Sequence, residues 1–148
     1  MIFIVLAKFT VEDKRIQQKF LVEAESVTDS EVKFNKWLPK NYSDSEITSS
    51  SVGNITEIAA IDFNEESDVF YLVMLSWTEQ ISEKKSKKKS MYIMINSDSG
   101  FDGAYKNVKN YIENYSSVDY EIESIAASRI ICDRELVNIA DYTNPLAS

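Results

Sequence analysis

The sequence predicts an α+β fold: one antiparallel β-sheet with two helices on one face, built from a strand-strand-helix-strand unit that occurs twice. One segment is repeated, because residues 44–55 (DSEITSSSVGNI) and 119–130 (DYEIESIAASRI) share Asp, Glu, Ile and Ser at corresponding positions. Each half also opens with an apolar run typical of a buried strand, at residues 1–10 and 69–78. A chain of 148 residues suits a single domain that contains both copies.

Copy one is expected to cover about residues 1–61 and to begin with a hairpin. The apolar run at its start and the return at residues 15–24 predict two strands joined by a polar turn. Thr28 is the expected N-cap of the helix that follows, since a Glu three residues later completes a capping box. Pro39 is expected to end this helix. The β-like stretch after the helix is interrupted at Gly53-Asn54, which predicts a turn or bulge.

An acidic joint, residues 62–68, is expected to connect the two copies as a solvated linker. Copy two, about residues 69–132, repeats the order of elements with a longer and basic hairpin tip, and Asp102 is the expected N-cap of its helix. The tail, residues 133–148, has no counterpart in copy one. Its apolar residues Leu136, Val137 and Ile139 hint at a short helix.

Composition excludes several kinds of catalytic site. The chain contains no histidine and one cysteine, which excludes histidine-assisted nucleophiles and zinc sites built from Cys and His. Three glycines do not form a Gly-rich phosphate loop. We therefore expect a protein that is not an enzyme and uses no cofactor or metal. The single Cys132 suits a reducing cytosol, and no apolar run approaches the length of a membrane span, so we expect a cytoplasmic protein without a membrane partner.

The hairpin tip at residues 83–89 is the candidate binding site. It concentrates positive charge on a chain whose formal net charge is −8. Trp77 and Tyr92 flank the tip and are candidate stacking residues for a nucleic acid, although packing in the core is the favoured explanation for both. Solubility and protection of a strand edge likewise explain the lysines without a ligand. The candidate lysines are Lys84, Lys85, Lys87, Lys88 and Lys89.

Three segments resemble a known family. They are residues 20–31 (FLVEAESVTDSE), 91–96 (MYIMIN) and 119–126 (DYEIESIA). These segments resemble a domain-of-unknown-function family of short α+β proteins from bacteria and their phages. The resemblance implies a protein of the bacterial cytosol or of a phage-infected cell, and it implies no activity, substrate or cofactor.

The sequence leaves several functions open. We expect a small accessory protein that binds a protein partner. The alternatives are a single-stranded nucleic-acid-binding module that uses the basic hairpin, and a homo-oligomer that sequesters a small nucleotide. A homodimer is expected because residues 2–7, 69–75 and 91–95 are apolar on both faces of their strands, while two helices cover only one face of the predicted sheet.

Overall fold

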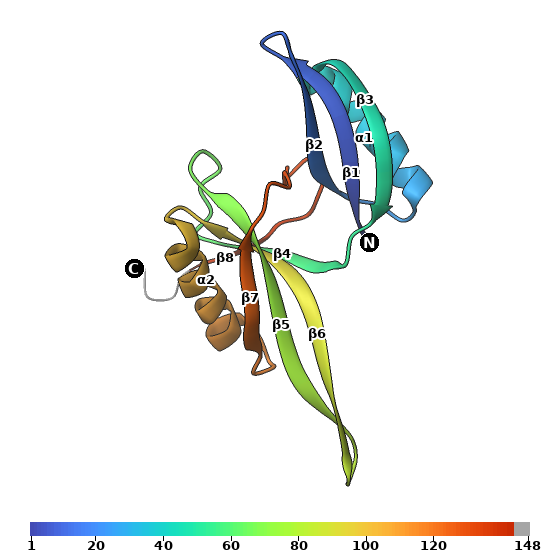
Figure 1. Cartoon of the computed structure of the whole chain (residues 1–148). Coiled ribbons are helices and arrows are strands. Elements are labelled where there is room, and N and C mark those ends of the chain that lie inside the picture. The colour runs from blue at the N-terminus through green and yellow to red at the C-terminus, as the bar shows by residue number, and fades with distance from the viewer. Residues whose placement is uncertain (144–148) are drawn as a thin grey trace. The chain divides into compact units, whose positions relative to one another are not determined.

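The computed structural model describes residues 1–143, which contain two helices and eight strands (Figure 1). The described residues form two compact units: the first contains residues 1–54 and 129–138, and the second contains residues 55–128 and the stretch that begins at Ile139. In chain order the elements are β1 (Ile2–Val11), β2 (Lys14–Glu23), α1 (Val27–Asn41), β3 (Ser43–Val52), β4 (Ile55–Ile61), β5 (Val69–Ser82), β6 (Lys85–Ser97), α2 (Gly100–Tyr115), β7 (Glu121–Ala127) and β8 (Ala140–Tyr142).

The α+β prediction is confirmed, but the prediction of one antiparallel sheet with both helices on its face is wrong. The strands form two sheets, a three-stranded antiparallel sheet of order β2-β1-β3 and a five-stranded mixed sheet of order β7-β5-β6-β4-β8. The expected interruption at Gly53-Asn54 is the place where the chain leaves the first sheet and enters the second. β4 then pairs in parallel with β6 and with β8, which makes the second sheet mixed.

Both units contain a hairpin, a helix and a strand in the same sheet order. β3 pairs with β1 on the side away from β2, and β7 pairs with β5 on the side away from β6. This shared order is what a strand-strand-helix-strand repeat predicts. Descent of the two units from one duplicated segment stays a prediction.

The first unit packs α1 against its own sheet. Val5, Ala7 and Phe9 of β1 alternate along one strand face and meet Phe20 of β2 and Phe34 of α1 in a buried cluster. The segment after residue 128 returns to this unit, where Ile131 exchanges two backbone hydrogen bonds with β2. Leu136 completes the cluster from the same segment.

The N-cap of α1 is Ser26, and the predicted cap Thr28 lies inside the helix. The Ser26 hydroxyl accepts a hydrogen bond from the Asp29 amide at 3.0 Å, and the Asp29 carboxylate accepts one from the Glu25 amide at 3.0 Å. This reciprocal pair satisfies two backbone donors, so it defines the start of the helix better than Thr28 does.

The prediction that Pro39 ends α1 is also wrong, because the helix continues to Asn41. Pro39 lies in the last turn, where its missing N–H removes a single intrahelical bond. The Tyr42 amide donates to the Leu38 carbonyl at 2.9 Å and closes the turn that contains the proline. A proline this near the end of the helix therefore destabilises α1 only slightly.

In the second unit α2 packs on the five-stranded sheet. Val108 and Tyr111 of the helix lie against Val73 and Leu75 of β5 and against Ile93 of β6. The predicted cap of α2 is displaced as well. The N-cap is Ser99 and the helix begins at Gly100, so Asp102 lies in the first turn as an acidic residue, where the helix dipole favours a negative charge.

The acidic segment, residues 62–68, lies inside the second unit between β4 and β5. The buried Asn96 side chain anchors it. Its amide nitrogen donates to the Asp68 carboxylate at 2.8 Å and to the Ile61 carbonyl at 2.9 Å, and its oxygen accepts from the Ile61 amide at 2.8 Å. The Asn64 amide donates to the same Asp68 oxygen at 2.8 Å. The segment is therefore held by side-chain hydrogen bonds.

The tail does not form the helix hinted at by its apolar residues. Residues 134–136 form a turn, and β8 then adds to the edge of β4. The last residues of the predicted tail, 144–148, lie outside the described residues. Among residues 1–143, no helix has the length and apolar character that crossing a membrane requires.

Candidate functional site

The two central strands of the second sheet extend beyond their neighbours. β7 pairs with β5 only as far as Ser76, and β4 pairs with β6 only from Tyr92 onward. Residues 77–91, which we call the arm, form a ribbon in which β5 and β6 pair only with each other among the described residues. Figure 1 shows the arm projecting beyond the other strands of its sheet.

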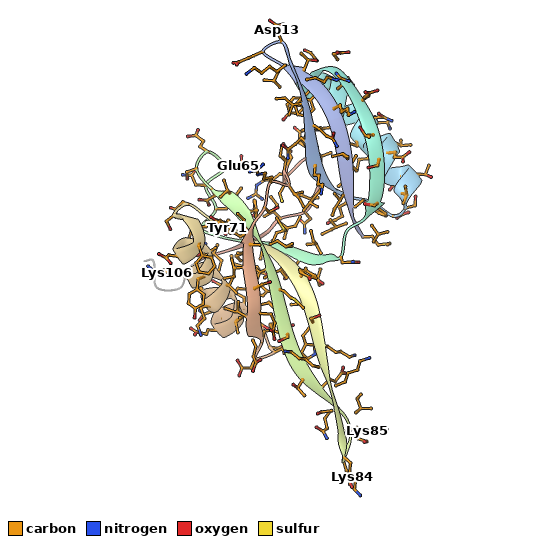
Figure 2. All side chains as sticks on the ribbon, in the orientation of Figure 1. Asp13, Glu65, Tyr71, Lys84, Lys85 and Lys106 are labelled. Atoms are coloured by element: carbon orange, nitrogen blue, oxygen red, sulfur yellow. The ribbon has the colours of Figure 1, made fainter. Side chains whose placement is uncertain are left out.

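The lysines of the arm lie mainly on a strand. The prediction of a long hairpin tip over residues 83–89 is wrong, because Ser82 pairs with Lys85 and leaves only Glu83 and Lys84 in the turn. Figure 2 shows Lys84 and Lys85 at the far end of the arm. Since side chains alternate along a strand, Lys85, Lys87 and Lys89 share one face of β6, and Lys88 lies on the other.

Two of the five lysines are paired. The Lys89 ammonium lies 2.5 Å from the Glu79 carboxylate, and the Lys88 ammonium lies 2.7 Å from the Glu123 carboxylate. The hydrogen bond from Lys88, followed by one from the Ser76 hydroxyl, lowers the pKa of Glu123, and the same carboxylate raises the pKa of Lys88. These are exposed pairs, so water and salt screen their attraction and they contribute little to stability.

The other three lysines, Lys84, Lys85 and Lys87, make no ion pair with any residue between 1 and 143. With Glu83 in the turn beside Lys84, they give the outer end of the arm a net positive charge.

Trp77 and Tyr92 do not form one stacking platform. Trp77 pairs across the hairpin with Lys89, three positions before Tyr92 on β6, so the two rings lie on opposite faces of the ribbon. The Trp77 ring meets the Tyr120 ring edge-on, with centroids 5.4 Å apart. Both candidate residues are half-buried. The structure therefore brings the five lysines onto one ribbon but separates the two aromatic candidates.

A groove between α2 and β7 was missed from the sequence. It has a volume of about 530 Å³, and its apolar walls come from Phe101, Tyr105 and Ile112 of the helix and from Ile122 and Ile125 of the strand. Phe101 is 55% exposed and Tyr105 is 45% exposed, although both are large and apolar in the ring. Their spacing of four residues puts them on one side of a helix, which was the available signal.

A carboxylate with two tyrosine partners lies at the other edge of the same sheet. The Tyr111 and Tyr142 hydroxyls each donate to the Glu57 carboxylate at 2.6 Å. Burial, followed by this hydrogen bond, raises the pKa of Tyr111 above its usual range, and the hydrogen bond to Glu57 raises the pKa of Tyr142 to about 12. The Tyr115 hydroxyl donates to the Thr143 carbonyl and adds a further tie to β8. The cluster attaches β8 to β4 and α2.

Among residues 1–143, no three acidic or cysteine side chains are grouped closely enough to hold a metal ion. Burial raises the pKa of the Cys132 thiol to about 12, so the thiolate is scarce at neutral pH. The absence of an enzymatic activity and of a cofactor stays a prediction.

The described residues define a two-sheet α+β protein whose exposed features are a basic β-ribbon and a groove beside an edge strand. The chain belongs to the family described as Domain of unknown function (DUF4494), whose model matches residues 7–132. The predicted resemblance to such a family is thereby confirmed. No curated protein and no solved structure matches the chain.

Proposed function

We propose that this chain is a non-catalytic binding protein that acts on a protein partner and uses the arm for recognition. The observation that carries the proposal is the set of three unpaired lysines, Lys84, Lys85 and Lys87, at the end of a ribbon that no other described strand covers. On a chain of net charge −8, such a tip attracts acidic surfaces and orients the approach of a partner.

The open edges of the arm support the same proposal. A ribbon with unpaired backbone groups pairs readily with another strand, and lysines on such edges commonly prevent indiscriminate pairing. An acidic partner removes that protection by neutralising the lysines. The arm therefore has a means of selecting its partner by charge.

Single-stranded nucleic acid is the second candidate. The row formed by Lys85, Lys87 and Lys89 on one face of β6 favours it, because such a row can follow a phosphate backbone. Lys89 is already paired with Glu79, and Trp77 is in contact with Tyr120. These contacts make the protein partner the better-supported candidate.

The test compares two triple variants that change the formal charge equally. The first replaces Lys84, Lys85 and Lys87 by Gln. The control replaces three exposed lysines elsewhere in the chain, Lys14, Lys36 and Lys106, by Gln. Both variants should fold like the parent, because exposed substitutions of this kind usually change stability by less than about 0.5 kcal/mol.

Affinity capture from nuclease-treated lysate of the source cells, with quantification by mass spectrometry, reports partner binding. We expect proteins that bind the parent and the control but are lost with the arm variant, and we expect their binding to weaken as salt is raised. Equal capture by both variants would contradict a role of the arm. Fluorescence anisotropy with a labelled single-stranded oligonucleotide tests the second candidate, which requires affinity that falls linearly with salt on logarithmic axes.

A further inference from the structure

Strand β7 has one unpaired side. It pairs with β5 from Tyr71 to Ser76, and no strand within residues 1–143 pairs with its other side. The usual protections of an edge strand are charged side chains (especially lysine), proline, a bulge, or a covering element. In β7 the charged residues Glu121 and Glu123 and the bulge at Glu123 all lie near the beginning of the strand, and the rest of it contains no charged residue or proline. The stretch from Ser124 to Ala127 therefore presents regular backbone donors and acceptors to solvent.

The groove lies beside this free edge. Helix α2 forms one wall with Phe101 and Tyr105, and the side chains of Ile122 and Ile125 form the other. A volume of about 530 Å³ is within the range that holds a ligand of several apolar groups. A free strand edge next to an apolar groove is the arrangement in which an added strand gains main-chain hydrogen bonds from the edge and side-chain specificity from the groove.

The charged residues that line the groove are mostly acidic. Lys109 lies 3.9 Å from Glu113 within the helix, and Glu123 is paired with Lys88. Asp119 and Glu121 also line the groove, and neither makes an ion pair with any residue from 1 to 143. The net charge of the residues that line the groove is therefore negative, and Asp119 and Glu121 lie at the end where β7 begins.

We propose that the groove between α2 and β7 binds an extended segment of a partner protein, which adds to β7 as a further strand. Alternate apolar side chains of the segment enter the groove between Tyr105 and Ile125, and a Lys or Arg lies beside Asp119 and Glu121. A segment of about five residues, roughly 17 Å long, matches the regular part of the edge and the acidic end. The proposal rests on the proposed function in that the ligand is part of a protein, but the groove does not include Lys84, Lys85 or Lys87, the three lysines on which that function depends.

The probe for this site is a displayed library of random nine-residue peptides, selected on the immobilised full chain. We expect enriched peptides to alternate apolar residues and to carry Lys or Arg toward one end. An enriched peptide, labelled with a fluorophore, is then titrated with the parent and with variants by anisotropy. Amide chemical shifts of the ¹⁵N-labelled chain locate the bound peptide, and we expect the changes at residues 121–127 and along α2.

Two variants of the groove separate its contributions. Replacing Phe101 and Tyr105 by Ala should weaken the peptide at least tenfold, and both residues are exposed enough that the fold is retained. Replacing Asp119 by Asn and Glu121 by Gln should weaken it severalfold at low salt and remove most of its salt dependence. The matched control replaces Val27 and Val32, exposed apolar residues of α1, by Ala and should bind within twofold of the parent.

Several results would overturn the proposal: no enriched peptide, enriched peptides without basic residues, unchanged binding by the Ala variant, or shift changes away from β7 and α2. Self-association of the chain that is lost with the Phe101 and Tyr105 variant would also overturn it, because the occupant would then be a second copy. The Lys84, Lys85 and Lys87 variant should bind the peptide like the parent. A failure of the arm in partner capture is thus distinguishable from a failure of the groove.

Discussion

Replacing Asn96 by Ala should destabilise the second unit by about 3 kcal/mol. The Asn96 side chain is 1% exposed and satisfies both backbone groups of Ile61 as well as the Asp68 carboxylate. Its loss leaves the Ile61 N–H and C=O without that partner, at roughly 1–3 kcal/mol for each buried group. The loss of the third hydrogen bond, from Asn96 to Asp68, adds little to the cost, because water replaces Asn96 at the half-buried Asp68 carboxylate.

The two tryptophans make the measurement specific for one unit. Trp37 packs against Phe20 and Phe34 in the first unit, and Trp77 packs against Tyr120 in the second. In a Trp37→Phe background the fluorescence therefore reports Trp77 alone. Urea unfolding followed by this signal gives the free energy of unfolding for the parent and for the Asn96→Ala variant.

Two further substitutions calibrate the result. The exposed Asn114 side chain donates a hydrogen bond to the Asn110 carbonyl within α2. Asn114→Ala should therefore lower the free energy of unfolding by no more than about 0.5 kcal/mol. Asn96→Asp retains an acceptor for the Ile61 amide but loses both donated bonds and places a carboxylate next to Asp68. It should be at least as destabilising as Ala at neutral pH and should recover as the pH falls. An Asn96→Ala variant within about 0.5 kcal/mol of the parent, with an unchanged denaturant slope, would refute this reasoning.

Three further predictions concern titration, thiol reactivity and mass. The pKa of Tyr142 is raised to about 12, so in the unfolded chain its phenol ionises at a lower pH than in the folded chain. The contribution of Tyr142 to the free energy of unfolding is therefore present below pH 10 and is lost as the pH rises toward 12. Tyr142→Phe should reduce this loss when urea unfolding is measured across the alkaline range. Cys132 is half-buried and its pKa is raised to about 12, so it should react with a disulfide reagent at pH 8 at least tenfold faster in denaturant than in the native state; equal rates would contradict the raised pKa. We expect light scattering at micromolar concentration to give the mass of a dimer, and a mass of 16.9 kDa would exclude it.

The elements that depend on local sequence were the predictable ones. The apolar runs predicted the hairpins. Apolar residues at helical spacing predicted both helices, and these residues are Phe34, Trp37 and Leu38 in α1 and Val108, Tyr111 and Ile112 in α2. The break at Gly53-Asn54 was also predicted, but the sequence did not show that the chain passes there from the first sheet to the second. Pairing of β4 with β6 joins residues more than thirty positions apart in parallel, and no local pattern encodes that choice of sheet.

The candidate site was only partly predictable for the same reason. Five lysines in six positions read as a loop because Lys is poorly represented in strands. Four of them have partners across the hairpin, between Trp77 and Ser82, and this pairing extends the strand through residues 85–89. The groove requires knowledge that β7 is an edge strand, and that follows from the sheet order rather than from the residues of β7.

A comparison of the two helices provides a final prediction about the groove. When the two helices are aligned in sequence with Phe34 matched to Val108, Glu31 of α1 corresponds to Tyr105 of α2. The first unit therefore has a carboxylate at the position where the second unit has an aromatic residue that lines the groove. Tyr105→Glu should leave stability within about 0.5 kcal/mol of the parent, because Tyr105 is 45% exposed and Glu favours a helix. The same change removes the apolar surface that an added strand would contact, so the selected peptide should bind at least fivefold more weakly. The reciprocal Glu31→Tyr variant, made in the first unit, should leave peptide binding unchanged. Full peptide affinity in the Tyr105→Glu variant would show that the strand edge alone accounts for binding and that the groove adds no specificity.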